Sequence, residues 1–141
     1  MLKLLLLVVS LGIAYSIGVG NYYPYPQFTG WGCRQPVYSV NGSHSSFIGC
    51  VKPTDKLLFN QVYNNSGSYF GTTKKLITYP KRGYIRNETI TGIWMFDYHR
   101  YGKGGYGRVI SGGVGYKNVT IELRSYKWGA GFNFLIQIYG Y

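Results

Sequence analysis

Apolar and polar residues alternate with a period of two near the C-terminal end of the chain. In residues 132–139 one side carries Phe132, Phe134, Ile136 and Ile138. In residues 118–125 one side carries Val119, Ile121 and Leu123, and the other carries Asn118, Thr120, Glu122 and Arg124. Strict alternation predicts strands with one buried face and one solvent-facing side. The short link at 128–131 has the length of a hairpin loop, so we expect these two strands to pair.

Upstream residues add further strand signals at 33–40, 56–63, 74–80, 89–97 and 107–111. Pro80 ends its segment, which indicates an edge strand. Segment 89–97 is apolar on both sides, with Ile90, Trp94 and Phe96 on one and Ile93 and Met95 on the other, as in a strand covered on both faces. No segment has sustained helical periodicity. The pattern predicts an all-β fold, a small antiparallel sandwich or barrel of about seven or eight short strands.

The domain organisation follows from length and composition. The chain has 141 residues, including 21 Gly and 16 Tyr, and few Ala and Glu, which argues against a helical bundle. We expect one all-β domain over 33–141. Residues 17–32 are rich in Tyr, Pro and Gly and predict an extended arm, in which Pro24 and Pro26 disfavour ladder hydrogen bonds.

The N-terminal residues 1–16 have the three parts of a secretory signal peptide. Lys3 is followed by the apolar run 4–13, and Ala14 and Ser16 are small residues at the positions that a signal peptidase reads. This apolar run is too short to span a bilayer, which requires about 20 apolar residues. We expect cleavage after Ser16, with Gly20 as the alternative, and a secreted chain with no membrane anchor. A buried N-terminal strand or helix is the alternative interpretation.

Two further features agree with export. The chain has two cysteines, Cys33 and Cys50, which we expect to form a disulfide in an oxidising compartment, worth about 3 kcal/mol. The eight Asn and 18 Ser and Thr predict about one N-glycosylation triplet by chance, yet the chain has four. Their acceptors are Asn41, Asn64, Asn87 and Asn118.

The sequence has few residues that could form a catalytic or metal site. The chain has four acidic residues and two histidines, and His44 alone lies between the cysteines, so zinc spacing is absent. Residues 102–107 match G-x-G-x-x-G, but a strand and more glycine follow where a nucleotide-binding helix is required. Asp97, His99 and Ser111 carry no motif that makes them a triad. We therefore expect no enzyme activity, no catalytic or metal residues and no cofactor.

Positive charge is the strongest functional signal. Lys and Arg number 15 against four acidic residues, for a net charge of +11. Two clusters are candidates for a basic binding patch: Lys74, Lys75, Lys81, Arg82 and Arg86 in one segment, and Arg100, Lys103 and Arg108 in another. Such charge attracts polyanions. Because a secreted chain seldom meets nucleic acid, we expect an anionic glycan, an anionic surface or an acidic protein as the extracellular partner. The oligomeric state stays open.

The segment from Pro53 onward resembles a known family. Residues 53–58, Pro-Thr-Asp-Lys-Leu-Leu, are similar to its P-G-D-R-L-L element. A strand ending in Asp97, the turn 112–115, the strand core 119–121 and the run 131–140 follow in the family's order. The match covers roughly 50–140 and resembles the insect probable salivary secreted peptides, also called multiprotein bridging factor 2. The changes, such as Val114 in place of Pro, indicate a divergent member.

The resemblance implies an extracellular protein of saliva, gut or haemolymph without established enzyme activity. We therefore expect a secreted, non-enzymatic binding or interaction protein with polyanion or glycan affinity. The family name implies a transcriptional coactivator, which is the alternative, and a small secreted enzyme is the third. The signal pattern, the sequons and the cysteine pair favour the secreted binding protein.

Overall fold

A computed structural model describes residues 26–28, 32–36, 43–99 and 104–141, in which all regular structure is β-strand. The expected signal peptide and most of the expected arm lie outside the described residues. The strands are β1 (Pro26–Phe28), β2 (Arg34–Pro36), β3 (Ser46–Gly49), β4 (Lys56–Asn65), β5 (Lys74–Tyr79), β6 (Ile90–Asp97), β7 (Gly105–Gly112), β8 (Val119–Ser125) and β9 (Phe132–Gly140).

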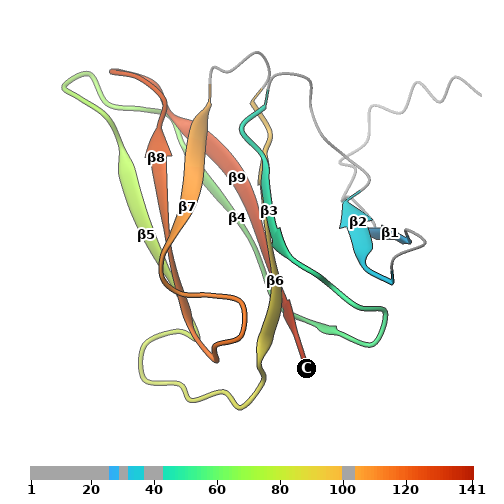
Figure 1. Cartoon of the computed structure of the whole chain (residues 1–141). Helices are drawn as coiled ribbons and strands as arrows, with labels where there is room; N and C mark the ends of the chain where they lie inside the picture. The colour runs from blue at the N-terminus through green and yellow to red at the C-terminus, as the bar shows by residue number, and fades with distance from the viewer. Residues whose placement is uncertain (1–25, 29–31, 37–42, 100–103) are drawn as a thin grey trace, which may run out of the picture.

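Seven strands form two antiparallel sheets that face each other (Figure 1). The four-stranded sheet has the order β3-β6-β9-β4, and the three-stranded sheet has the order β5-β8-β7. The prediction of an all-β sandwich is therefore confirmed. β5 is an edge strand that stops before Pro80, as expected. β4 extends to Asn65, two residues beyond the predicted strand.

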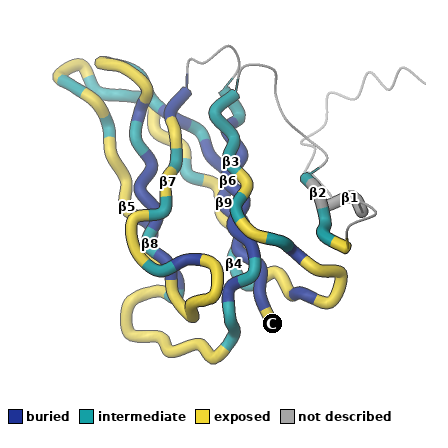
Figure 2. The backbone as a smooth tube through the Cα atoms, in the orientation of Figure 1, coloured by how far each residue is buried: buried dark blue, intermediate teal, exposed yellow. Residues whose placement is uncertain are grey.

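The main core lies between the two sheets, where Figure 2 shows the buried stretches. Ile121 and Leu123 of β8 contribute from the three-stranded sheet, and Phe134 and Ile136 of β9 from the four-stranded sheet. All four side chains are fully buried. The period-two alternation thus identified the inward faces of both strands correctly.

The expected hairpin between residues 118–125 and 132–139 is wrong. β8 pairs with β5 and β7, whereas β9 pairs with β4 and β6. The link 126–131 therefore crosses from one sheet to the other. Its short length is compatible with either connection, because a sandwich corner and a hairpin need similar numbers of residues.

The four-stranded sheet is apolar on both faces, which corrects two expectations. Leu135 and Tyr139 of β9 are buried on the face that was expected to meet solvent, beside Trp94 and Phe96 of β6. Ile90 does not share that face, because a register shift between Ile90 and Gly92 turns it into the main core. β6 is covered on both faces, as predicted.

The disulfide between Cys33 and Cys50 is present, with the two Cα atoms 5.2 Å apart. Next to it, the backbone of Arg34 pairs with that of Val51. These contacts attach the two-stranded β1–β2 sheet beside the four-stranded sheet. The pairing of Pro26–Phe28 with Arg34–Pro36 corrects the expectation of an arm without ladder pairing. Residues 37–40 of the expected first strand lie outside the described residues.

Candidate functional site

The outer face of the three-stranded sheet carries a charged cluster centred on Glu122. Glu122 on β8 lies opposite Leu76 on β5 and Arg108 on β7. Its carboxylate lies 2.7 Å from the Lys74 Nζ, and Arg108 donates to one oxygen from Nε at 3.0 Å and from a terminal nitrogen at 2.9 Å. Two candidate residues from separate sequence clusters therefore meet at one acidic side chain.

Glu122 was expected to face solvent, but only 3 % of this residue is exposed. The basic side chains that bind it take the place of water around the carboxylate. The hydrogen bond from Lys74 lowers the pKa of Glu122 below its ordinary value of 4.5, and Arg108 acts in the same direction against the opposing effect of burial. Glu122 is therefore ionised at neutral pH, and the cluster of three side chains keeps a net positive charge.

Positive charge is distributed unequally between the two layers. Residues 74–89 and 104–131, which form the three-stranded sheet with its flanking loops, carry nine Lys and Arg against two Glu. The other described residues carry three Lys and Arg against two Asp. The basic layer is therefore the three-stranded sheet and its loops, and we use this name for those two ranges.

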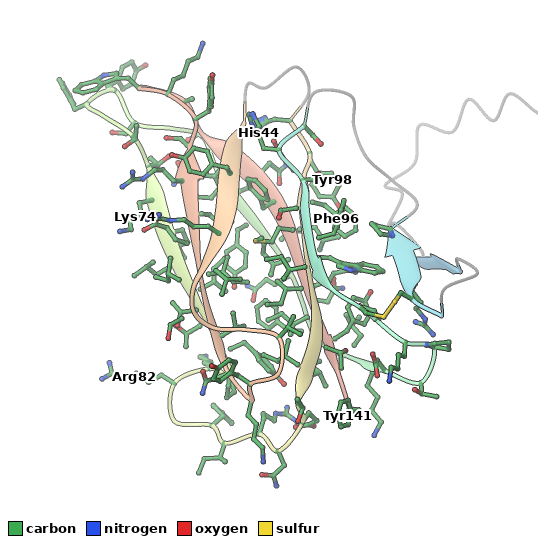
Figure 3. The ribbon with its side chains drawn as sticks, viewed as in Figure 1. His44, Lys74, Arg82, Phe96, Tyr98 and Tyr141 are labelled. Carbon is green, nitrogen blue, oxygen red and sulfur yellow. A yellow bond between two sulfur atoms is a disulfide. The ribbon has the colours of Figure 1, made fainter. Side chains whose placement is uncertain are left out.

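The structure divides the first predicted basic cluster. Lys74 and Lys75 begin β5, whereas Lys81, Arg82 and Arg86 lie in the β5–β6 loop (80–89) beyond the other end of that strand. Figure 3 shows Lys74 and Arg82 far apart along the basic layer. β5 is a strand of six residues, about 17 Å at the usual rise. The two groups therefore lie at opposite ends of one layer.

The second predicted cluster is described only in part. Arg108 lies on β7 and binds Glu122, whereas Arg100 and Lys103 lie outside the described residues. Among the basic residues of the loop, Arg86 lies 3.6 Å from Glu88. Each acidic residue of the basic layer thus has a basic partner, and the remaining basic side chains provide its excess charge.

Sequence reasoning missed three basic residues of this layer, namely Lys117, Arg124 and Lys127. Arg124 lies directly opposite Lys74 on β5 and Tyr106 on β7. The alternation in residues 118–125 did place Arg124 on the outward side with Glu122. What the sequence did not reveal is that β5 and β7 flank this strand and bring their basic residues to it.

The carboxylates of the two aspartates accept hydrogen bonds from neighbouring segments of the chain. Asp97 ends β6, and its carboxylate accepts the backbone N–H of His44 at 3.1 Å and of His99 at 2.9 Å. Gly104 packs against it so closely that a Cβ would lie 2.6 Å from Oδ1. Asp55 accepts the Lys52 N–H and the Thr91 hydroxyl, each at 2.7 Å. Both aspartates therefore hold neighbouring segments together.

The histidines lie beside Asp97 without forming a recognisable metal centre. The Nδ1 of His44 is 3.8 Å from the nearer Asp97 oxygen, and its ring stacks on Tyr126 with 5.3 Å between the ring centres. Within the described residues, no three His, Cys, Asp or Glu side chains are grouped so as to hold a metal ion.

Three of the four predicted glycosylation acceptors are described, and all three are exposed: Asn64 on β4, Asn87 in the β5–β6 loop and Asn118 just before β8. Asn41 lies outside the described residues. Glycan occupancy itself remains a prediction. No helix among the described segments is long and apolar enough to cross a membrane.

Comparison with known proteins places these features in a family. The family model described as transcription activator MBF2 matches residues 48–140. A probable salivary secreted peptide of Bombus ignitus is 34% identical over 101 residues, which cover 72% of this chain and 72% of that protein. No solved structure matches the chain. The match begins within β3 and ends with β9, so it includes both main sheets, and the chain belongs to the MBF2 family, as its resemblance implied.

Proposed function

We propose that this chain is a secreted, non-catalytic insect protein whose basic layer binds an anionic extracellular partner, with an anionic glycan as the first candidate. The observation that carries the proposal is the charge asymmetry, nine basic against two acidic residues in one layer. Exposed positive charge attracts a polyanion without requiring a cavity. An acidic protein is the other candidate partner.

Secretion is supported by the name of the Bombus ignitus relative and by the Cys33–Cys50 disulfide, since such bonds persist in oxidising compartments. The signal pattern in residues 1–16 and the exposed sequons agree with it. Intact-mass measurement of protein from insect-cell medium tests this part. A protein that keeps residues 1–16, or that stays in the cytosol with free thiols, would instead support the coactivator function in the family name.

The non-catalytic part is supported by the use of the four carboxylates. Asp55 and Asp97 accept backbone or hydroxyl hydrogen bonds, and Glu88 and Glu122 pair with basic side chains. Each of these four carboxylates, all of which lie in the described part of the chain, therefore has a partner within the fold.

Retention on a heparin column tests the binding proposal. We expect the wild type to elute at raised salt, because salt screens the attraction between exposed charges. The variant Lys81→Ser/Arg82→Ser should elute at clearly lower salt. Its matched control, Lys52→Ser/Lys56→Ser, loses the same charge from exposed positions outside the basic layer and should elute close to the wild type. Equal shifts of both variants, or elution of the wild type at low salt, would contradict a binding role for this layer.

A further inference from the structure

Two loops at one end of the sandwich expose a group of aromatic side chains. The β4–β5 loop (66–73) carries Tyr69 and Phe70, which are 94% and 92% exposed, and the β8–β9 loop (126–131) carries Trp128, which is 70% exposed. Figure 2 shows both loops beyond the ends of β5 and β8, at the upper left. We call Tyr69, Phe70 and Trp128 the aromatic tip. Leaving three large aromatic side chains in water opposes the usual driving force for burial.

The aromatic tip is held in place by bonds between its two loops. The Trp128 indole Nε1 donates to the Tyr69 carbonyl at 3.1 Å, and the Gly129 N–H donates to the Gly71 carbonyl at 3.0 Å. Gly67 has a φ of +101°, and a Cβ there would overlap the Gly129 carbonyl oxygen. The loops therefore present the aromatic side chains from an ordered base.

This arrangement suits an apolar environment better than a sugar ring. Because the Trp128 N–H already has a partner in the chain, the indole can leave water without losing that hydrogen bond. Phe70 has no polar atom. The segments 66–75 and 124–131 contain no carboxylate or carboxamide side chain, the groups that commonly fix a ligand by hydrogen bonds.

Positive charge lies directly behind the aromatic tip. Segments 66–75 and 124–131 contain Lys74, Lys75, Arg124 and Lys127 and no acidic residue. Lys74 pairs with Glu122, and the other three make no ion pair among the described residues. Membrane-associated proteins commonly place aromatic side chains at the depth of the lipid headgroups. Lysine and arginine next to the membrane surface add attraction to anionic lipids.

We propose that the aromatic tip inserts into the headgroup region of an anionic lipid surface, with the exposed side chains of Lys75 and Lys127 facing the lipid phosphates. The protein then docks on the membrane from outside and reversibly. This goes beyond the proposed glycan binding, since it uses one end of the basic layer and its aromatic side chains rather than charge alone.

Co-sedimentation with vesicles tests the proposal. We expect the wild-type chain to bind vesicles of phosphatidylcholine with phosphatidylserine, and to bind pure phosphatidylcholine far less. Tyr69→Ser/Phe70→Ser should lower the partition coefficient at least about tenfold, since two aromatic side chains no longer leave water. Replacing Lys75 or Lys127 by Ser should lower it about fivefold each.

The matched control is Tyr84→Ser/Ile85→Ser in the β5–β6 loop. These side chains are 67% and 92% exposed and lie among basic residues at the opposite end of the layer. This variant should bind vesicles like the wild type. The Tyr69→Ser/Phe70→Ser variant, which we call the tip variant, should keep the unfolding midpoint and the heparin elution of the wild type. This result would separate membrane docking from glycan binding.

Insertion is measured directly with brominated lipids, which quench tryptophan fluorescence at short range. Vesicle-bound wild type should be quenched, and Trp128→Phe should stay bound but lose that quenching. Three results would overturn the proposal. The wild type could fail to bind anionic vesicles, the tip variant could bind them as well as the wild type, or the Tyr84→Ser/Ile85→Ser control could lose vesicle binding while the tip variant keeps it. Loss of heparin retention by the tip variant, without vesicle binding, would identify a sugar-binding platform in its place.

Discussion

Lys74 on β5 donates a hydrogen bond to Glu122 on β8, with 2.7 Å between the Lys74 Nζ and the Glu122 Oε2. Because Lys74 lies opposite Arg124, this bond runs diagonally across the strand pair. Arg108 approaches the same carboxylate from β7. One acidic side chain thus links all three strands of the basic layer on its outer face.

Glu122→Gln should destabilise the chain at neutral pH and much less in acid. The lowered pKa of Glu122 means that its ionised form stabilises the folded state above the carboxyl's ordinary pKa near 4.5. That contribution is lost as pH falls through the lowered folded-state pKa. Denaturant unfolding of wild type and variant between neutral and acid pH should show the two curves converging on the acid side. The control Glu88→Gln, which breaks a longer pair at 3.6 Å, should have a smaller effect.

Phe134→Ala should lower the free energy of unfolding by about 3–5 kcal/mol, because it empties a fully buried position in the main core. Phe70→Ala is the matched control. Its side chain is 92% exposed, so the change should stay within about 0.5 kcal/mol. Denaturant titration measures both. A Phe134→Ala variant as stable as the wild type would contradict the assignment of this face to the core.

Asp97 and Gly104 should be coupled. Asp97→Ala leaves two backbone N–H groups without their acceptor and should cost about 1–3 kcal/mol. Gly104→Ala places a Cβ 2.6 Å from Oδ1 and should cost a similar amount, about 1–3 kcal/mol, through overpacking. Because removal of the carboxylate relieves that contact, Gly104→Ala should cost less in the Asp97→Ala background. Strict additivity in the double-mutant cycle would refute direct coupling.

Glycan occupancy should follow exposure. We expect glycans on Asn64, Asn87 and Asn118, which are exposed on three different parts of the domain. Single Asn→Gln variants expressed in insect cells should each lose one glycan mass and keep the unfolding midpoint. The difference in intact mass before and after enzymatic deglycosylation gives the total glycan mass. A variant with the same total glycan mass as the wild type would exclude occupancy at the substituted site.

Local pattern predicted β4 to β9 well, because alternation directly reports which side chains face a core, but it predicted neither β1 nor β3. It failed where distant segments decide the environment. Glu122 lies on the outward side as expected, yet Lys74 and Arg108 shield it, and neither is near it in the sequence. The outer side of β9 is buried for the same reason, since Trp94 and Phe96 of the neighbouring β6 continue its apolar surface.

The candidate surfaces were predicted less completely than the fold. Composition and clustering identified most basic residues of the basic layer, but segment 74–86 runs the length of an edge strand and so separates its own charges. The aromatic tip joins residues 69–70 to residue 128, and no local pattern connects them. Only the crossing of both loops at the same end of the sandwich brings them together.

The position of β9 has a consequence for how the domain is made. It follows the other described strands in the sequence, yet it lies in the interior of the four-stranded sheet, where it separates β4 from β6. β4 and β6 do not pair with each other, so the four-stranded sheet cannot be completed during synthesis until residues 132–140 have left the ribosome, although β3 can pair with β6 earlier. Completion of the main core must follow the synthesis of β9, and pairing between residues far apart in the sequence, such as Lys56 and Gly140, is slower than local pairing. A stop codon before Phe132 would therefore remove the middle of the sheet and leave two unpaired edges exposed to aggregation.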